Sequence, residues 1–221
     1  MIKTLFTTLV IMTLVMGQNG YADIVVYELS GEPGNQVSTA GTPAANATAA
    51  DLTRGAGLTG NAGLNSLNSV GWNTLDATDF VSFGFTVDAG YFANLGDITF
   101  TGRSSNTGPG TLAIRSSLDG FASNLFTFTQ TGTTDTQVNY DASGLGPVTG
   151  ALEFRIFSLN NTSANGGTVG TAGTWRVGSA NVGSTTQLTI GGNIVAIPEP
   201  TSAGLIGLVF VAGALTRRRQ R

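Results

Sequence analysis

Short runs in which hydrophobic and polar residues alternate recur along the middle of the chain. The clearest is Leu-Glu-Phe-Arg-Ile at residues 152–156, where three hydrophobic residues alternate with Glu153 and Arg155. A period of two places successive side chains on opposite faces of a β-strand, so one face can be buried while the other meets solvent. Between residues 23 and 196 no run shows the period of an α-helix. The pattern therefore predicts an all-β body.

Eight runs have the alternation or the β-branched and aromatic content of strands. They are 24–27, 80–87, 98–101, 111–115, 124–129, 151–157, 174–177 and 186–190. Glycine-, asparagine- and proline-rich segments such as 106–110 and 144–147 separate them, as expected of turns. Strands at this spacing predict an antiparallel sandwich or barrel. Residues 31–71 lack clear strands and are expected to form a long loop or irregular strands laid over the sandwich.

Composition removes several function classes. The chain has no cysteine and no histidine, so its core must hold without disulfides and it lacks the usual general base and zinc ligand. Residues 23–197 contain five arginines, no lysine and twelve acidic residues, a net charge of −7. An acidic body argues against binding nucleic acid, because phosphates need clustered cations.

The last 25 residues, 197–221, have a different character. Residues 201–216 contain no charged side chain, and as a helix they would span roughly 24 Å, a short crossing of a bilayer core of about 30 Å. Four arginines among the last five residues would keep that end in the cytoplasm. The segment predicts a single C-terminal transmembrane helix with the body outside. The alternative is a buried core helix followed by a basic end.

The first 22 residues have the order of a secretory signal peptide. Lys3 gives a positive start, residues 5–16 are mostly apolar, and Gly20 and Ala22 are the small residues that a signal peptidase requires. We expect signal peptidase to cleave after Ala22, so that the mature protein begins at Asp23. A retained N-terminal anchor is the alternative.

The C-terminal segment resembles the PEP-CTERM sorting signal of Gram-negative bacteria. The matching residues are Pro198, Glu199, Pro200, Arg217, Arg218, Arg219 and Arg221. The resemblance implies that an exosortase, an integral-membrane cysteine transpeptidase, cuts near the triplet. The protein would then sit transiently in the inner membrane before reaching the cell surface or extracellular matrix.

A weaker resemblance covers part of the body. Residues 110–121, 152–157 and 173–177 look like segments of other PEP-CTERM proteins. In those proteins a jelly-roll-like β-sandwich precedes the tail, commonly without an assigned activity. The expected organisation is thus a signal peptide (1–22), a β-sandwich domain (23–196) and a sorting signal (197–221).

Catalytic patterns are lacking. Glycoside hydrolysis needs two carboxylates across one cleft, and no such pair stands out. A calcium site is a weaker hypothesis. Asp76 and Asp79 precede the strand expected at 80–87, and Asp88 follows it. Carboxylates in loops suit calcium, but aspartate also commonly caps turns.

Sugar binding would need an exposed aromatic face. Trp72, in a glycine- and asparagine-rich segment, and Tyr91 are the candidates, whereas Trp175 is expected in the core. The sequence therefore predicts an exported structural or adhesive protein without a cofactor and not an enzyme. The alternative is a carbohydrate- or calcium-binding module that acts on exopolysaccharide.

Overall fold

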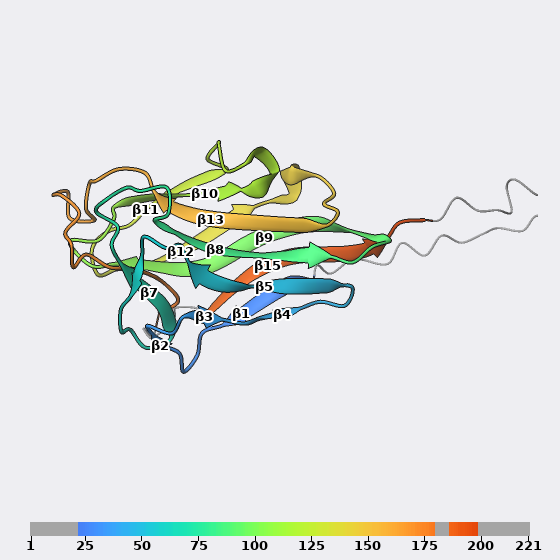
Figure 1. Cartoon of the computed structure of the whole chain (residues 1–221), viewed down its shortest axis with the longest axis horizontal. Helices are drawn as coiled ribbons and strands as arrows, with labels where there is room; N and C mark the ends of the chain where they lie inside the picture. Colours follow the sequence, from blue (N-terminus) through green and yellow to red (C-terminus); the bar gives the residue numbers. More distant parts are fainter. Residues whose placement is uncertain (1–21, 180–185, 199–221) are drawn as a thin grey trace, which may run out of the picture.

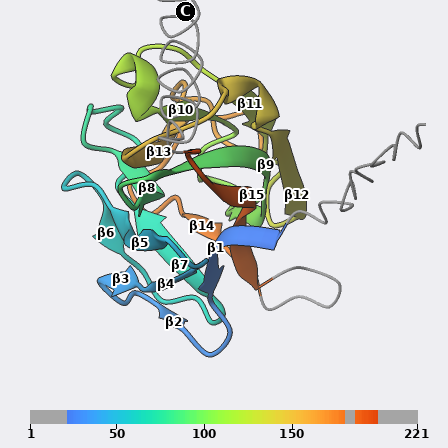
Figure 2. The same ribbon diagram turned by 90° about the vertical axis from the view of Figure 1, so that its right-hand side faces the viewer.

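The protein folds as two facing β-sheets. The computed structural model describes residues 22–179 and 186–198, and no α-helix occurs among them. Figure 1 shows the strands running along the long axis of the molecule, and Figure 2 looks along that axis at the two layers. Two short 3₁₀ turns, η1 (Ser117–Asp119) and η2 (Ser143–Leu145), complete the regular structure of the described residues. The predicted all-β sandwich is confirmed.

The larger sheet has nine strands in the order β2-β7-β14-β9-β15-β1-β4, with β12 added beside β9 and β6 beside β7. These strands are β1 (Ala22–Glu28), β2 (Pro33–Gly34), β4 (Gly41–Pro43), β6 (Thr59–Gly60), β7 (Ser66–Val70), β9 (Tyr91–Ser104), β12 (Asp135–Asp141), β14 (Trp175–Val177) and β15 (Gln187–Ala196). The long strand β9 pairs with β15, β14 and β12, all antiparallel.

The smaller sheet has six strands in the order β11-β10-β13-β8-β5-β3. They are β3 (Ser38–Thr39), β5 (Ala47–Arg54), β8 (Phe80–Val87), β10 (Thr111–Ser116), β11 (Phe126–Thr129) and β13 (Ala151–Ser158). All neighbours in this sheet are antiparallel. The register of β13 on β8 places Phe154 opposite Phe83, and their rings stack 5.5 Å apart in the core.

The core lies between the sheets and consists of their inward-facing side chains. Alternate residues of β8, from Val81 to Val87, are buried, as are Leu152, Phe154 and Ile156 of β13. Both sets are the ones predicted from the alternation. Because each strand contributes only one face to the core, the outward faces remain available for other contacts.

Each of the eight predicted strands overlaps an observed strand, although residues 124–125, 174 and 186 lie outside them, and three features differ. Strand β12 was not predicted, and β9 is much longer than the predicted 98–101. Residues 31–71 form short strands of both sheets and do not lie over the sandwich as a loop. Leu52 and Leu67 in this segment are fully buried, whereas Leu64 is 59% exposed.

A half-buried arginine holds this segment together. Arg54, at the end of β5, donates hydrogen bonds to the carbonyl oxygens of Gly34 (2.5 Å), Gln36 (2.5 Å) and Asn68 (2.7 Å). Its Nε also donates to Ser69 Oγ at 3.0 Å. Burial lowers the pKa of Arg54 to about 10, so the side chain is still charged at neutral pH. It thereby ties β5 of one sheet to β7 of the other.

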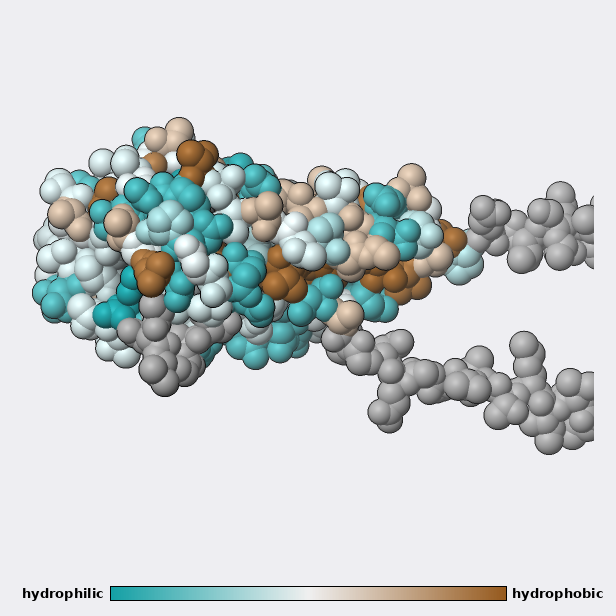
Figure 3. Space-filling model, turned by 90° about the horizontal axis from the view of Figure 1, so that it is seen from below, coloured by the Kyte–Doolittle hydropathy of each residue, from teal (hydrophilic) through white to brown (hydrophobic). Residues whose placement is uncertain are grey.

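The two ends of the sandwich differ. Strand β15 ends at Ala196, and Ile197 N–H donates to Gly90 O, so Pro198 lies at the right-hand end in Figure 1. The connections 71–79, 105–110 and 159–174 lie at the opposite end. Surface hydrophobic residues are dispersed: on the face shown in Figure 3 they form small groups among hydrophilic ones.

Several predictions about the termini fall outside the described residues. These are residues 1–21 of the predicted signal peptide (1–22), the predicted transmembrane helix over 201–216, and the sorting residues Glu199, Pro200, Arg217, Arg218, Arg219 and Arg221. Among residues 22–179 and 186–198, there is no helix long and apolar enough to cross a bilayer.

The hydroxyl of Tyr27 links the two sheets through the core. It accepts a hydrogen bond from Gly84 N–H (3.0 Å) and lies 2.7 Å from Ala50 O and 2.9 Å from Gly84 O. Ala50 borders a β-bulge in β5, where the register shifts. Burial raises the pKa of Tyr27 well above its ordinary value of 10.0. This contribution to stability is therefore complete below pH 10 and is lost as the pH rises toward the folded-state pKa.

We expect Tyr27→Phe to lower the free energy of unfolding by about 1–3 kcal/mol at pH 7, because buried partners lose a hydrogen bond. Urea unfolding of residues 22–198 followed between pH 8 and 11 should also show a shallower alkaline loss of stability in the variant. Equal slopes in the two proteins would contradict the role assigned to the hydroxyl.

Candidate functional site

The outer face of the six-stranded sheet carries a row of polar side chains across three strands. The register places Arg155 of β13 opposite Arg115 of β10 on one side and Ser82 of β8 on the other. These residues point away from the core because their neighbours along each strand point into it. Two arginines directly opposite each other repel unless other groups compensate.

Aromatic rings provide part of that compensation. The Arg155 guanidinium lies between the Phe121 ring, 3.9 Å from its centroid, and the Phe80 ring, 4.1 Å away. Its Nε donates to Glu153 Oε1 at 2.7 Å, which forms an ion pair. Contact of a cation with an aromatic face contributes about 0.5–2 kcal/mol. Stacking on two faces and pairing with Glu153 hold Arg155 in one orientation.

Phe121 reaches this position through an unusual backbone conformation. After η1, Gly120 and Phe121 both adopt left-handed conformations, with φ of 69° and 64°. The carboxylate of Asp119 accepts hydrogen bonds from Ala122 N–H (3.1 Å) and Ser123 N–H (2.9 Å), which fixes the chain beyond the turn. A left-handed residue with a large side chain costs roughly 1–2 kcal/mol. The contact of Phe121 with Arg155 offsets that cost.

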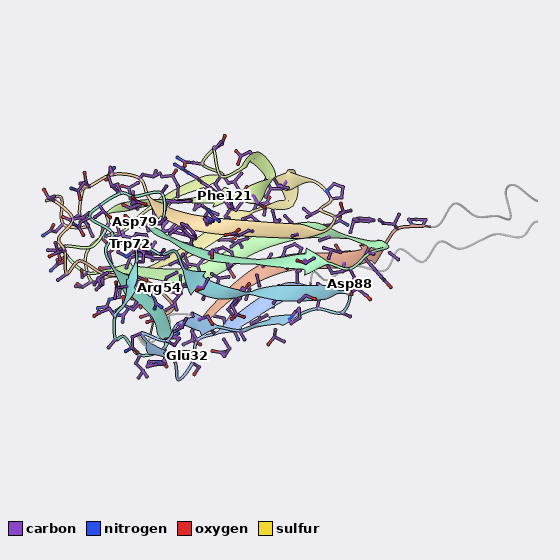
Figure 4. The ribbon with its side chains drawn as sticks, in the orientation of Figure 1. Glu32, Arg54, Trp72, Asp79, Asp88 and Phe121 are labelled. Carbon is purple, nitrogen blue, oxygen red and sulfur yellow. The ribbon has the colours of Figure 1, made fainter. Side chains whose placement is uncertain are left out.

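Arg115 completes the cluster. Its guanidinium lies 5.0 Å from the centroid of the Phe157 ring, and its Nε donates to Asn124 Oδ1 at 2.8 Å. Nη1 donates to Phe121 O at 3.3 Å. Arg115 therefore fixes the segment after η1 that carries Phe121. Figure 4 shows Phe121 above the sheet, between Asp79 and Trp72 at one end of the sandwich and Asp88 at the other.

We call this cluster the arginine–phenylalanine platform; it consists of Phe80, Arg115, Phe121, Arg155 and Phe157. A pocket of about 440 Å³ opens beside it. The loop that carries Asp76 and Asp79 forms the other side of the pocket. A second hollow, of about 650 Å³, lies further along the same face over small residues such as Ala50, Ser82 and Ala151. Arg155 lines the first hollow and its partner Glu153 lines the second, so their ion pair lies between the two hollows.

Asp76 and Asp79 lie in the same loop, and their carboxylates accept hydrogen bonds from other residues of that loop. Asp79 is 2% exposed, and its Oδ2 accepts from Thr74 Oγ1 (2.5 Å) and Asp76 N–H (2.7 Å). Asp76 Oδ1 accepts from Thr78 N–H (2.9 Å) and its hydroxyl (2.8 Å), which lowers the pKa of Asp76. Both carboxylates therefore shape the turn before β8.

Asp88 lies at the opposite end of the sandwich from Asp79 (Figure 4). Its N–H donates to Asn46 O, and its carbonyl accepts from Tyr91 N–H. The three aspartates proposed as calcium ligands are thus not at one site. Within the described part of the chain, no cluster of three or more Asp, Glu, His or Cys side chains is placed to hold a metal.

The prediction that Trp72 is exposed is wrong. Its exposed fraction is 0%, its ring packs edge-on against Trp175 with centroids 5.6 Å apart, and its Nε1 donates to Ser69 O at 3.1 Å. A sugar cannot reach that ring. Trp175 is buried as predicted. Tyr91 is only partly buried, but it lies at the sandwich end where the chain leaves, far from the platform.

The platform residues were not predicted as a site. The sequence carries only a weak signal for them: Asp119-Gly120 predicts a turn, and Phe121 directly after it is a large hydrophobic residue where turns are usually polar. Their meeting depends on the pairing of β10, β13 and β8, which no local pattern shows.

No protein-family model, curated protein or solved structure matches the chain. What the site can do follows from its chemistry alone. A fixed guanidinium and a nearby carboxylate can hydrogen-bond to the hydroxyl groups of a sugar. Partly exposed aromatic rings can stack on the apolar face of the sugar ring. Glu153, beside the platform, is paired with Arg155.

We expect Phe121→Gly to be more stable than Phe121→Ala by about 1 kcal/mol. Both variants lose the ring, but only glycine accepts the left-handed backbone without strain. Thermal unfolding of the two variants and the wild type measures this difference. A more stable alanine variant would show that the backbone at 121 is not held in that conformation.

Proposed function

We propose that this chain is an exported, non-catalytic protein of the bacterial cell surface or extracellular matrix with an adhesive role. In this proposal signal peptidase removes residues 1–22, and the tail from 197 to 221 inserts into the inner membrane as a transmembrane helix. An exosortase then reads Pro198, Glu199 and Pro200. The body acts as a jelly-roll-like sandwich that contacts exopolysaccharide.

One observation carries the adhesive part of the proposal: the pocket beside the platform extends to the loop of Asp76 and Asp79, and Asp79 lies at the end of the sandwich away from Asp88 and from the exit of β15 (Figure 4). A body held through its tail would present that end outward. The pocket is lined by hydrogen-bond donors, acceptors and aromatic rings that other contacts hold in position, and such preorganised sites lose little entropy on binding. A polyhydroxylated chain matches such a lining.

The platform should be required for retention on exopolysaccharide. We expect Phe121→Ala to weaken binding about fivefold, as loss of about 1 kcal/mol of stacking implies. The matched control is Leu118→Ala, which removes a 52% exposed side chain from the same turn but outside the pocket lining. Co-sedimentation with polysaccharide from the native host measures the retained fraction. Equal retention of the two variants would remove the platform from the proposal.

Sorting should depend on the triplet itself. Replacing Pro198, Glu199 and Pro200 by alanine leaves residues 201–216 and the arginines intact, so membrane affinity is kept while recognition is lost. We expect full-length protein to accumulate in the inner membrane and the surface fraction to empty. Fractionation and intact-mass analysis in the native host test this. If wild type and variant partition alike and both keep Arg221, the tail is a plain anchor.

A further inference from the structure

A third hollow, with a mainly polar lining, lies on the nine-stranded sheet and reaches Ser105 and Thr174 in the connections at the end away from Pro198. It has a volume of about 250 Å³ and lies over the ends of β9 and β14. The register aligns four residues across four strands: Asn68 of β7, Arg176 of β14, Arg103 of β9 and Asp135 of β12. They face outward because Trp175 and Val177 on either side of Arg176 are buried in the core.

The charges in this row do not balance. Arg103 and Arg176 are directly opposite each other, and the one carboxylate in the row, Asp135, pairs with Arg103 at 3.4 Å. Burial, and then the charge of Arg103, lower the pKa of Arg176. Like charges opposite each other on a sheet destabilise it. The body has a net charge of −7, whereas this row carries two arginines and one carboxylate and is locally positive.

Arg176 is also the arginine whose donors are unused. Arg54, Arg103, Arg115 and Arg155 each donate at least one hydrogen bond to the protein. Within residues 22–179 and 186–198, Arg176 donates none, although its side chain is half-buried beside the backbone of Gly63. No Arg176 nitrogen is among the fully buried atoms that lack a partner in the described residues, so water reaches these donors and a ligand carboxylate can take the place of that water.

The remaining lining indicates the rest of the ligand. Asn61, Ser105, Thr133 and Thr174 supply amide, hydroxyl and backbone groups around the two arginines. Thr133 holds a left-handed backbone with φ of 59°, rare for a β-branched residue and a mark of functional sites. The volume is below the roughly 300 Å³ at which pockets for drug-sized ligands begin, so one small anionic unit fits.

We propose that this hollow binds the carboxylate of an acidic sugar residue, with Arg176 as the principal donor. The planar guanidinium can hold a carboxylate through two parallel hydrogen bonds, and the hydroxyl and amide groups can meet the sugar hydroxyls. Arg103 adds charge but stays with Asp135. The site is on the opposite sheet from the platform, so it binds whether or not the platform does.

Isothermal titration of the full chain in detergent tests this site with galacturonate, galactose, and inorganic sulfate and phosphate. We expect galacturonate to bind and galactose not to bind. Arg176→Gln should weaken galacturonate binding about tenfold or more, the loss expected for hydrogen bonds to a charged group. Arg176→Lys keeps the positive charge but loses the planar guanidinium, so its affinity for galacturonate should lie between those of the wild type and Arg176→Gln.

Val37→Glu is the matched control for charge. It changes the net charge by the same amount at a side chain that is 86% exposed and outside the hollow, so binding should stay as in the wild type. A thermal melt of each variant confirms folding, and Arg176→Lys carries the test if Arg176→Gln does not fold. Equal losses in Val37→Glu and Arg176→Gln would overturn the site, as would binding of sulfate or phosphate without galacturonate, or no binding at all.

Discussion

One edge of the sandwich depends on the hydrogen bonds of the half-buried Arg54 guanidinium. Within the described part of the chain no carboxylate pairs with it, and the backbone carbonyl oxygens of Gly34, Gln36 and Asn68 accept its hydrogen bonds. A buried cation is tolerated only where such acceptors surround it. Residues 33–36 and 66–69 must therefore keep their conformations together. This explains how a segment with few hydrophobic residues remains ordered at the edge of both sheets.

Beyond that edge, stability comes from two sheets that share a large aromatic core. Tyr27 contacts Phe83 edge-on, Phe83 stacks on Phe154, and Trp72 and Trp175 close the end where the loops gather. With no cysteine in the chain, these contacts take the place of disulfides. A core that is complete without ligand leaves the outer faces of both sheets free to carry charged side chains.

The strands β8 and β13 could be predicted because each alternates hydrophobic residues strictly. Strand β12 could not, since of its residues Asp135–Asp141 only Val138 is buried. Strand β5 is likewise rich in alanine and threonine and is held by pairing with β8, a non-local contact. Trp72 was misplaced because its glycine- and asparagine-rich neighbours suggested exposure, while Trp175, a hundred residues away, buries it. The platform and the Arg176 row depend on register, which local patterns do not reveal.

The position of β15 has a mechanical consequence. This strand leads to Pro198 and lies between β9 and β1, with both neighbours antiparallel. A force applied through the tail would pull β15 along its own axis, while the hydrogen bonds to both neighbours run across that axis. All of these bonds would then be strained together in shear and would not open one after another. A protein anchored at this end could resist flow without any covalent cross-link.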